Sequence, residues 1–201
     1  LLNYRGGSFL IPDEAQARRA AALAGVLIEP VSDGQVATIK GEIAGQNMDA
    51  IPLERTPRVA IYSPPNANPW DDAVTMVLEY AEIPYDKVFD DEVLEDKLIL
   101  YDWLHLHHED FTGQYGKFWN SHRNATWYID EVKENEANAA KHGYGKVSAM
   151  KLAVTKKIRD FVLGGGFLFA MCSATDTYDI SLAADGVDIV ESMFDYDGID
   201  P

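Results

Sequence analysis

The sequence predicts an α/β protein in which a parallel sheet is flanked by helices. Short apolar runs with strand character, such as 59–62, alternate with longer stretches whose apolar residues recur at helical spacing. The firmest of these helices spans 147–161, and a glycine run at 164–166 separates it from a wholly apolar strand at 167–171. Strands that alternate with helices are typical of parallel βαβ units, so we expect helices on both faces of the sheet.

The N-terminal quarter of the chain predicts a small βα unit that belongs to a larger domain. Its expected strands are 1–4, 26–30 and 48–53. An Ala-rich helix from Asp13 ends at Gly25, and a second helix starts at the capping box formed by Ser32 and Gln35. Both ends of the chain resemble internal segments, so we expect a fragment of a longer protein.

Thr56–Pro57 marks a boundary that divides the chain into this unit, 1–56, and an α/β domain at 57–201 with an incomplete C-terminal end. The expected elements of the second domain are strands at 59–62, 87–89, 98–106, 167–171 and 187–190, a helix capped by Asn68 with Pro69 in its first turn, and helices at 128–141 and 147–161. Parallel sheets bind ligands beyond the C-terminal ends of their strands. That rule brings together the loops after Tyr62, Leu106 and Met171.

The charge balance restricts the partners of the chain. Its 201 residues include 33 acidic and 17 basic side chains, a formal net charge of −16. Nucleic acid and anionic membrane surfaces would be repelled by that field, and no apolar run is long enough for a transmembrane segment. We therefore expect a small-molecule ligand. The acidity by itself indicates a soluble or salt-adapted surface, and the sequence leaves a cytoplasmic and an exported location open.

The only cysteine, Cys172, lies in the pattern Ala-Met-Cys-Ser-Ala directly after an apolar strand. Small residues two positions before and after a nucleophile are typical of the sharp strand-to-helix turn called a nucleophile elbow. The N–H of Ser173 would then help to hold an oxyanion. Asp176 would pair with a base or cap the next turn. The alternative is a buried structural cysteine, a common state for a free thiol.

A cluster of histidines follows the strand at 98–106. His105 and His107 share one face of a strand, a spacing that can give two imidazoles to one divalent metal. Alternatively, His107 or His108 is the general base for the cysteine, with Glu109 orienting the imidazole. Hydrogen-bonded histidines at a polar strand end are the third interpretation. Gly113, a few residues on, lies in a loop suited to close approach over a ligand.

Four segments together resemble a known family: LLNYRGGSF, PWDDAVTMVLEYAEIPYDKVFDDEVL, YDWLHLHHEDFTGQYGKF and GGGFLFAMCSATDTYDISLAA. They are similar to bacterial proteins labelled asparagine synthetase B-like, whose core is similar to the class I glutamine amidotransferase fold. The resemblance covers nearly the whole chain. It implies a flavodoxin-like sheet and places Cys172 at the nucleophile position of the amidotransferases.

The sequence departs from the amidotransferase pattern in its elbow and in its expected base. The elbow is Ala-x-Cys-x-Ala, no histidine follows Cys172, and residues 107–110 replace a glycine-rich oxyanion loop. Three hypotheses follow. The chain is a cysteine-dependent hydrolase without an organic cofactor, or an inactive binding or scaffold subunit of a larger assembly that retains the fold, or a protein with a divalent metal at His105 and His107.

Overall fold

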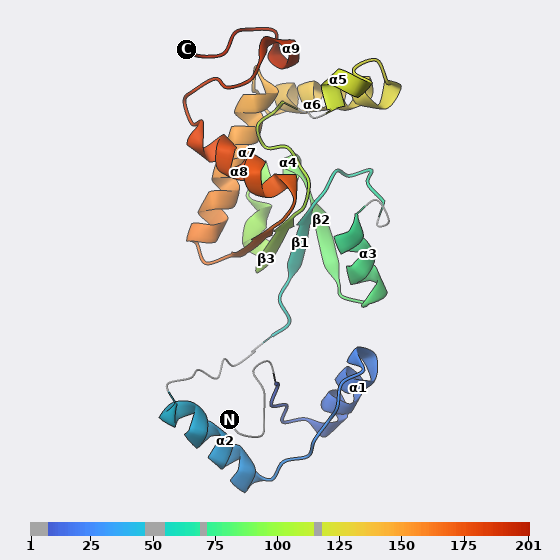
Figure 1. Ribbon diagram of the computed structural model, residues 1–201, viewed down its shortest axis with the longest axis vertical. Helices are drawn as coiled ribbons and strands as arrows, with labels where there is room; N and C mark the ends of the chain where they lie inside the picture. The colour runs from blue at the N-terminus through green and yellow to red at the C-terminus, as the bar shows by residue number, and fades with distance from the viewer. Residues whose placement is uncertain (1–7, 47–54, 69–71, 115–117) are drawn as a thin grey trace. The chain divides into compact units, whose positions relative to one another are not determined.

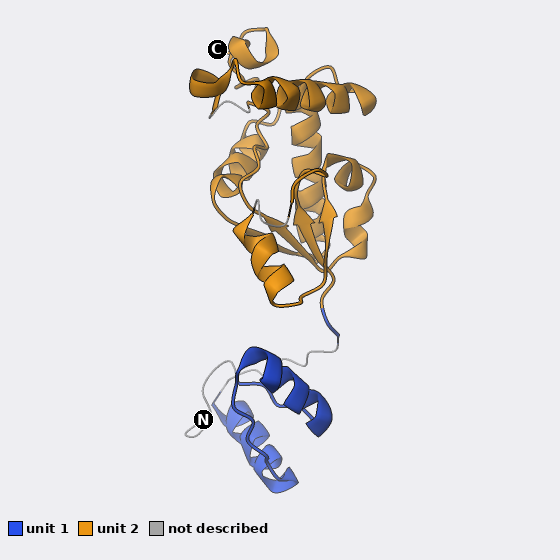
Figure 2. Ribbon diagram, turned by 90° about the vertical axis from the view of Figure 1, so that its right-hand side faces the viewer, with its two compact units in different colours: residues 1–56 blue, residues 57–201 orange. Residues whose placement is uncertain are grey.

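The computed structural model describes residues 8–46, 55–68, 72–114 and 118–201. The chain divides into two compact units, residues 1–56 and 57–201 (Figure 2). The strands predicted at 1–4 and 48–53 lie outside the described residues.

The first unit contains two helices in its described part. Helix α1 (Glu14–Ala24) begins where the Asp13 carboxylate accepts the Gln16 N–H and ends at Gly25, which has a φ of 64°. Helix α2 (Asp33–Gly45) has the predicted Ser32–Gln35 capping box. The strand predicted at 26–30 is wrong. These residues form no regular element, and the Val26 N–H donates to the Ala21 carbonyl at the end of α1 and not to a neighbouring strand.

The second unit is built on four parallel strands in the order β2-β1-β3-β4 (Figure 1). They are β1 (Val59–Tyr62), β2 (Tyr85–Val88), β3 (Trp103–Leu106) and β4 (Phe167–Ala170). Val59 lies opposite Tyr85 on one side and Trp103 on the other, and Leu106 lies opposite Ala170. The predicted parallel α/β architecture is confirmed.

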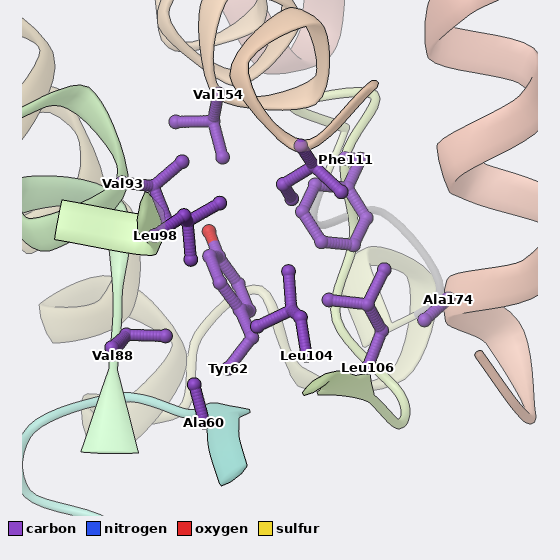
Figure 3. Packing of buried hydrophobic residues seen from close by; sticks show 11 residues of the cluster. Ala60, Tyr62, Val88, Val93, Leu98, Leu104, Leu106, Phe111, Val154 and Ala174 are labelled. Carbon is purple, nitrogen blue, oxygen red and sulfur yellow. The ribbon is translucent and has the colours of Figure 1, made fainter. Parts of the chain in front are cut away.

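Some of the helices of this unit cover the sheet, on both of its sides. The described helices are α3 (Ala73–Tyr80), α4 (Asp90–Leu94), η2 (Lys97–Leu100), α5 (Trp119–His122), α6 (Thr126–Lys141), α7 (Val147–Leu163), α8 (Ser173–Ala183) and α9 (Ser192–Asp195). Helices α7 and α8 lie on one side of the sheet and α3 on the other (Figure 1). The main core forms on the α7 side, where Tyr62, Leu104 and Leu106 meet Val154 of α7 and Ala174 of α8 (Figure 3).

The strand predicted at 98–106 is shorter than expected. Residues Lys97–Leu100 form the 3-10 helix η2, and β3 begins only at Trp103. The N–H groups of Asp102 and Trp103 both donate to the carbonyl of Arg58, at 2.9 and 3.2 Å. The partner strand β1 starts just after Arg58, so it sets where pairing of β3 can begin.

The predicted cap at Asn68 and the predicted strand at 187–190 are both wrong. In both places an aspartate carboxylate accepts backbone N–H groups, and this local bonding sets the structure. Helix α3 is capped by Asp72, not by Asn68. Residues 187–190 form no strand, since the Asp188 N–H donates to the Asp200 carboxylate and the Val190 N–H donates to Asp188. Such local bonds compete with a sheet ladder.

Candidate functional site

Three loops meet at the C-terminal edge of the sheet, as the parallel topology requires. The Met171 N–H donates to the Leu106 carbonyl at 3.1 Å, and the Ala174 N–H donates to the His107 carbonyl at 3.4 Å. The loop after β3 therefore runs beside the turn from β4 into α8. The third loop, after β1, contributes Asp72, whose Oδ2 lies 2.9 Å from Nδ1 of His107.

Cys172 occupies a strained turn between β4 and α8. It is the N-cap of α8, with φ 54° and ψ −143°, and its side chain is exposed. This conformation is rare for residues other than glycine and costs of order 1–3 kcal/mol. Ala174, two positions on, is fully buried in the core. The alternative of a buried structural cysteine is wrong, and the backbone has the sharp form expected of a nucleophile elbow.

Side-chain bonds attach the first turns of α8 to the loop after β3. The Ser173 hydroxyl donates to the His108 carbonyl at 2.9 Å, and the Thr177 hydroxyl donates to the Glu109 carbonyl at 2.8 Å. These bonds hold the histidine backbone against the turn that carries Cys172. Asp176 is exposed in the first turn of α8, where a carboxylate faces the positive end of the helix dipole.

The imidazoles of His107 and His108 converge on one carboxylate. Nδ1 of His108 lies 2.7 Å from Nδ1 of His107, which in turn lies 2.9 Å from Oδ2 of Asp72. Asp72 is nearly buried, and its Oδ1 accepts the Val74 N–H at 2.6 Å. Within the described ranges, no hydrogen bond joins the Cys172 sulfur to an imidazole.

Glu109 does not orient either imidazole. Its Oε2 accepts the backbone N–H of His107 at 2.9 Å. Burial raises the pKa of the Glu109 carboxyl, and that backbone bond opposes the rise. The carboxylate that contacts an imidazole of the pair is Asp72, a residue that the sequence analysis did not name. Its signal was the acidic pair before α3, in the loop after the first strand of the sheet.

His105 lies apart from this convergence. It is buried on β3, where its ring stacks on Phe169 with centroids 5.4 Å apart. Its ring centroid is 6.4 Å from that of His107, and its Nε2 has no hydrogen-bond partner among the described residues. Burial lowers the pKa of His105, and the charge of Asp72 opposes this. The predicted pair His105–His107 is therefore replaced by His107–His108, because the chain leaves the strand after Leu106 and the alternation of faces ends there.

Gly113 is placed by packing against α7. Its φ is 79°, and a Cβ on it would lie 2.7 Å from Cα and N of Ser148. This is the close approach that the loop composition predicted, but its partner is the first turn of a helix. A hollow of about 210 Å³ lies nearby, lined in part by Thr112, Ser148 and Ser181. Its lining includes neither Cys172 nor an imidazole.

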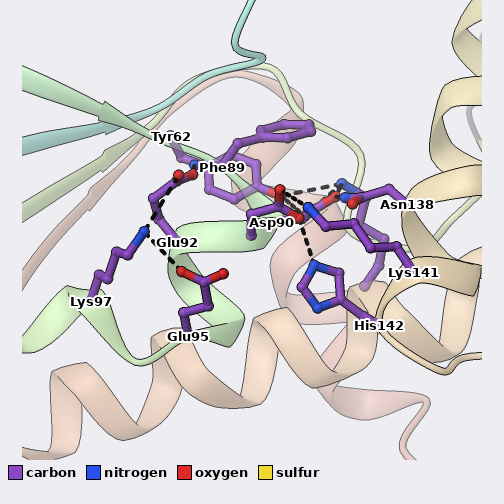
Figure 4. A network of polar contacts seen from close by, with 11 residues as sticks. Tyr62, Phe89, Asp90, Glu92, Glu95, Lys97, Asn138, Lys141 and His142 are labelled. Carbon is purple, nitrogen blue, oxygen red and sulfur yellow. Dashed lines mark hydrogen bonds and ion pairs between the residues drawn. The ribbon is translucent and has the colours of Figure 1, made fainter.

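A buried polar network supports the same edge of the sheet from the α7 side. Lys151 Nζ lies 2.9 and 2.8 Å from the two carboxylate oxygens of Asp90, and the Tyr62 hydroxyl also bonds to Asp90. Burial and the Asp90 charge raise the pKa of Tyr62. Figure 4 shows Asp90 near Asn138, whose amide donates to it at 3.4 Å. Tyr62, Asp90 and Lys151 are all shielded from solvent, so we assign them a structural role.

Comparison with protein-family models, with curated protein sequences and with solved structures found no significant match to this chain. Within the described residues, no helix combines the length and the apolar character that crossing a membrane requires. The function is therefore argued from the geometry at Cys172 and at the histidine pair.

Proposed function

We propose that this chain is a cysteine-dependent hydrolase, similar to the class I glutamine amidotransferases, that acts on a small polar amide or ester. The observation that carries the proposal is the backbone of Cys172, which holds an exposed thiol at φ 54° between a parallel strand and a helix N-terminus. A strained turn at this position is the device that projects a nucleophile from a sheet. The strand order β2-β1-β3-β4 agrees with a flavodoxin-like sheet, which supports the same family.

In the proposed reaction, the Cys172 sulfur attacks the substrate carbonyl carbon and its proton passes to an imidazole of the His107–His108 pair. The N–H of Ser173, at the start of α8, donates to the oxyanion. The imidazolium then protonates the leaving group, and water hydrolyses the thioester. Asp72 takes the orienting role through its contact with His107. Catalytic hydrogen bonds are often long without substrate, so the sulfur and the base are expected to approach when substrate binds.

A second candidate is a binding or scaffold subunit that retains the fold without chemistry. The missing bond between the thiol and an imidazole in the described residues favours it. The two candidates differ in one property, the reactivity of the thiol.

The chain has a single cysteine, so alkylation of a thiol reports on Cys172 alone. We would measure the rate of iodoacetamide labelling at pH 7 for the native chain and for the variants His107→Asn and His108→Asn. A hydrolase predicts labelling about tenfold faster than that of a free cysteine derivative, with a loss of this advantage in at least one histidine variant. It also predicts ammonia release from a small amide such as glutamine or asparagine, abolished in Cys172→Ala. Labelling at the rate of the free thiol, with no amide cleaved, would leave the scaffold candidate.

A further inference from the structure

We propose that Asp72, His107 and His108 form a binding site for one divalent transition-metal ion such as Zn²⁺. Their ligating atoms all lie within 4.8 Å of one another, although the three residues come from two separate loops of the sheet edge. The inference does not depend on the thiol of Cys172. With an ion bound, the ligating nitrogens of His107 and His108 no longer accept a proton, so the base role proposed above belongs to the metal-free chain.

Counting protons shows why a cation suits this arrangement. Oδ2 of Asp72 and Nδ1 of His108 both approach Nδ1 of His107, at 2.9 and 2.7 Å. If the proton sits on His108, then the Nδ1 lone pair of His107 faces a carboxylate oxygen. If the proton sits on His107, one N–H must serve two acceptors at once. With Asp72 as a carboxylate, no distribution of protons on the two imidazoles gives each contact its own hydrogen, whereas a metal ion accepts all three electron pairs.

The donor set indicates the class of metal. Two imidazole nitrogens and one carboxylate oxygen are the ligands of open zinc sites, which keep a further position for water or substrate. Zinc bonds of 2.0–2.1 Å place tetrahedral ligands about 3.3 Å apart. The two contacts at His107 therefore need to lengthen by about half an ångström, and the ligating atoms of Asp72 and His108 lie within 4.8 Å of each other. Mg²⁺ and Ca²⁺ prefer sites made of oxygen alone and are expected to bind poorly.

The three ligand residues are already held by other bonds. The Asp72 carboxylate accepts the Val74 N–H, and the His107 N–H donates to Glu109. The His108 carbonyl accepts the Ser173 hydroxyl. Only the bond to Asp72 involves a ligating group and helps to orient it. The other two bonds fix the backbone of the loop that carries the two imidazoles, so the loop position of each ligand is set before an ion binds.

A second observation beside the site points the same way. His105 is buried and stacks near His107, yet its Nε2 has no partner among the described residues. A buried ring nitrogen without a hydrogen bond costs about 1–3 kcal/mol. The polar groups of this edge are thus not satisfied by the described protein atoms alone.

The other group of possible metal ligands, Asp188, Asp195 and Asp197, serves as a contrast. There the ammonium of Lys146 lies 2.6, 3.1 and 2.6 Å from the three carboxylates. That group contains its own cation. Among the described residues, no lysine or arginine forms an ion pair with the group at Asp72, and its ligands include two nitrogens.

The test is a Zn²⁺ titration by calorimetry of the chelator-treated chain, with Co²⁺ absorbance as a second readout. The Cys172→Ser background removes the thiol as a ligand, so the outcome is independent of the proposed hydrolase. We expect one equivalent of Zn²⁺ to bind, a visible Co²⁺ band that Zn²⁺ abolishes, and no binding of Mg²⁺.

Single variants assign the ligands. Each of the single variants Asp72→Asn, His107→Asn and His108→Asn is expected to weaken Zn²⁺ binding by at least about tenfold. Asparagine at position 72 keeps a side chain suited to cap α3. The control is His122→Asn, which removes an imidazole of α5 and should leave the affinity unchanged. The proposal is overturned if the parent chain binds no Zn²⁺, or if the three ligand variants bind it as tightly as the parent.

Discussion

Lys151 and Asp90 form an ion pair that is sealed inside the second unit, with Nζ 2.8 Å from Oδ2 and only 6% of the lysine side chain exposed. The ammonium also lies 4.7 Å from the centroid of the Phe89 ring. Helix α7 is thereby joined to the start of α4, directly below the edge of the sheet that bears the candidate site. A pair of this kind is costly to break from one side, because the remaining charge stays buried.

We therefore predict that Lys151→Met lowers the free energy of unfolding by about 3–5 kcal/mol. Methionine has nearly the same helix propensity as lysine, so the loss reports on the Asp90 charge. The matched control is Lys156→Met on the same helix, whose partner Asp185 is well exposed. That variant should lose less than about 1 kcal/mol. Urea denaturation of both proteins decides the matter, and equal losses would contradict a special role for Lys151.

Sequence reasoning succeeded where one local rule settles the structure. The amphipathic pattern of 147–161 agrees with α7 (Val147–Leu163), and the capping box at Ser32 is present. It failed where the outcome depends on a distant partner. The first residue of β3 follows from where its neighbour β1 begins, and β1 lies some forty residues earlier in the chain.

In the candidate site, too, the local features could be predicted and the long-range contacts could not. The turn at Cys172 could be predicted because small flanking residues are a local requirement of its geometry. The carboxylate facing His107 could not, since Glu109 is nearer in sequence while Asp72 is nearer in space. A contact between loops after different strands follows from topology and register, which one sequence does not specify.

Gly113 provides a test of the structural role that its surroundings indicate. We predict that Gly113→Ala is more destabilising than Gly143→Ala by about 1–3 kcal/mol, the usual cost of overpacking. The two glycines have nearly equal φ, 79° and 81°, but only the first would place its Cβ against the backbone of Ser148. Thermal unfolding of the pair separates the two effects. Equal destabilisation would mean that strain in φ is the whole cost and that the loop is not fixed against α7.

The contact of Asp91 with Lys141 and His142 gives a prediction about pH. These partners, Lys141 first, lower the pKa of Asp91 below its usual 3.8. A lowered carboxyl pKa stabilises the folded state above the unfolded value, and this stability is lost as the pH falls through the folded value. Asp91→Asn should thus lower the urea midpoint at pH 7, and the difference from the native chain should shrink below about pH 4. A difference that stays constant down to pH 2 would contradict the assigned contact.

The backbone of Cys172 can be tested apart from any chemistry. At an ordinary position in a helix or strand, a glycine variant has a free energy of unfolding about 0.5–1 kcal/mol lower than the alanine variant. At φ 54° and ψ −143° the order should reverse, because glycine alone avoids the Cβ strain. We predict that Cys172→Gly is more stable than Cys172→Ala by about 1 kcal/mol.

Part of that difference would come from the preference of N-cap positions for glycine over alanine. Ala125 measures this part, because it is the N-cap of α6 with an ordinary φ of −77°. The free energy of unfolding should rise more from Cys172→Ala to Cys172→Gly than it rises from the native chain to Ala125→Gly. The difference between the two increases is the strain stored at the Cys172 turn. An excess of zero would remove the backbone argument for a nucleophile at Cys172. A clear excess, found without any substrate, would mean that the fold maintains a strained cysteine at the sheet edge at a cost in its own stability.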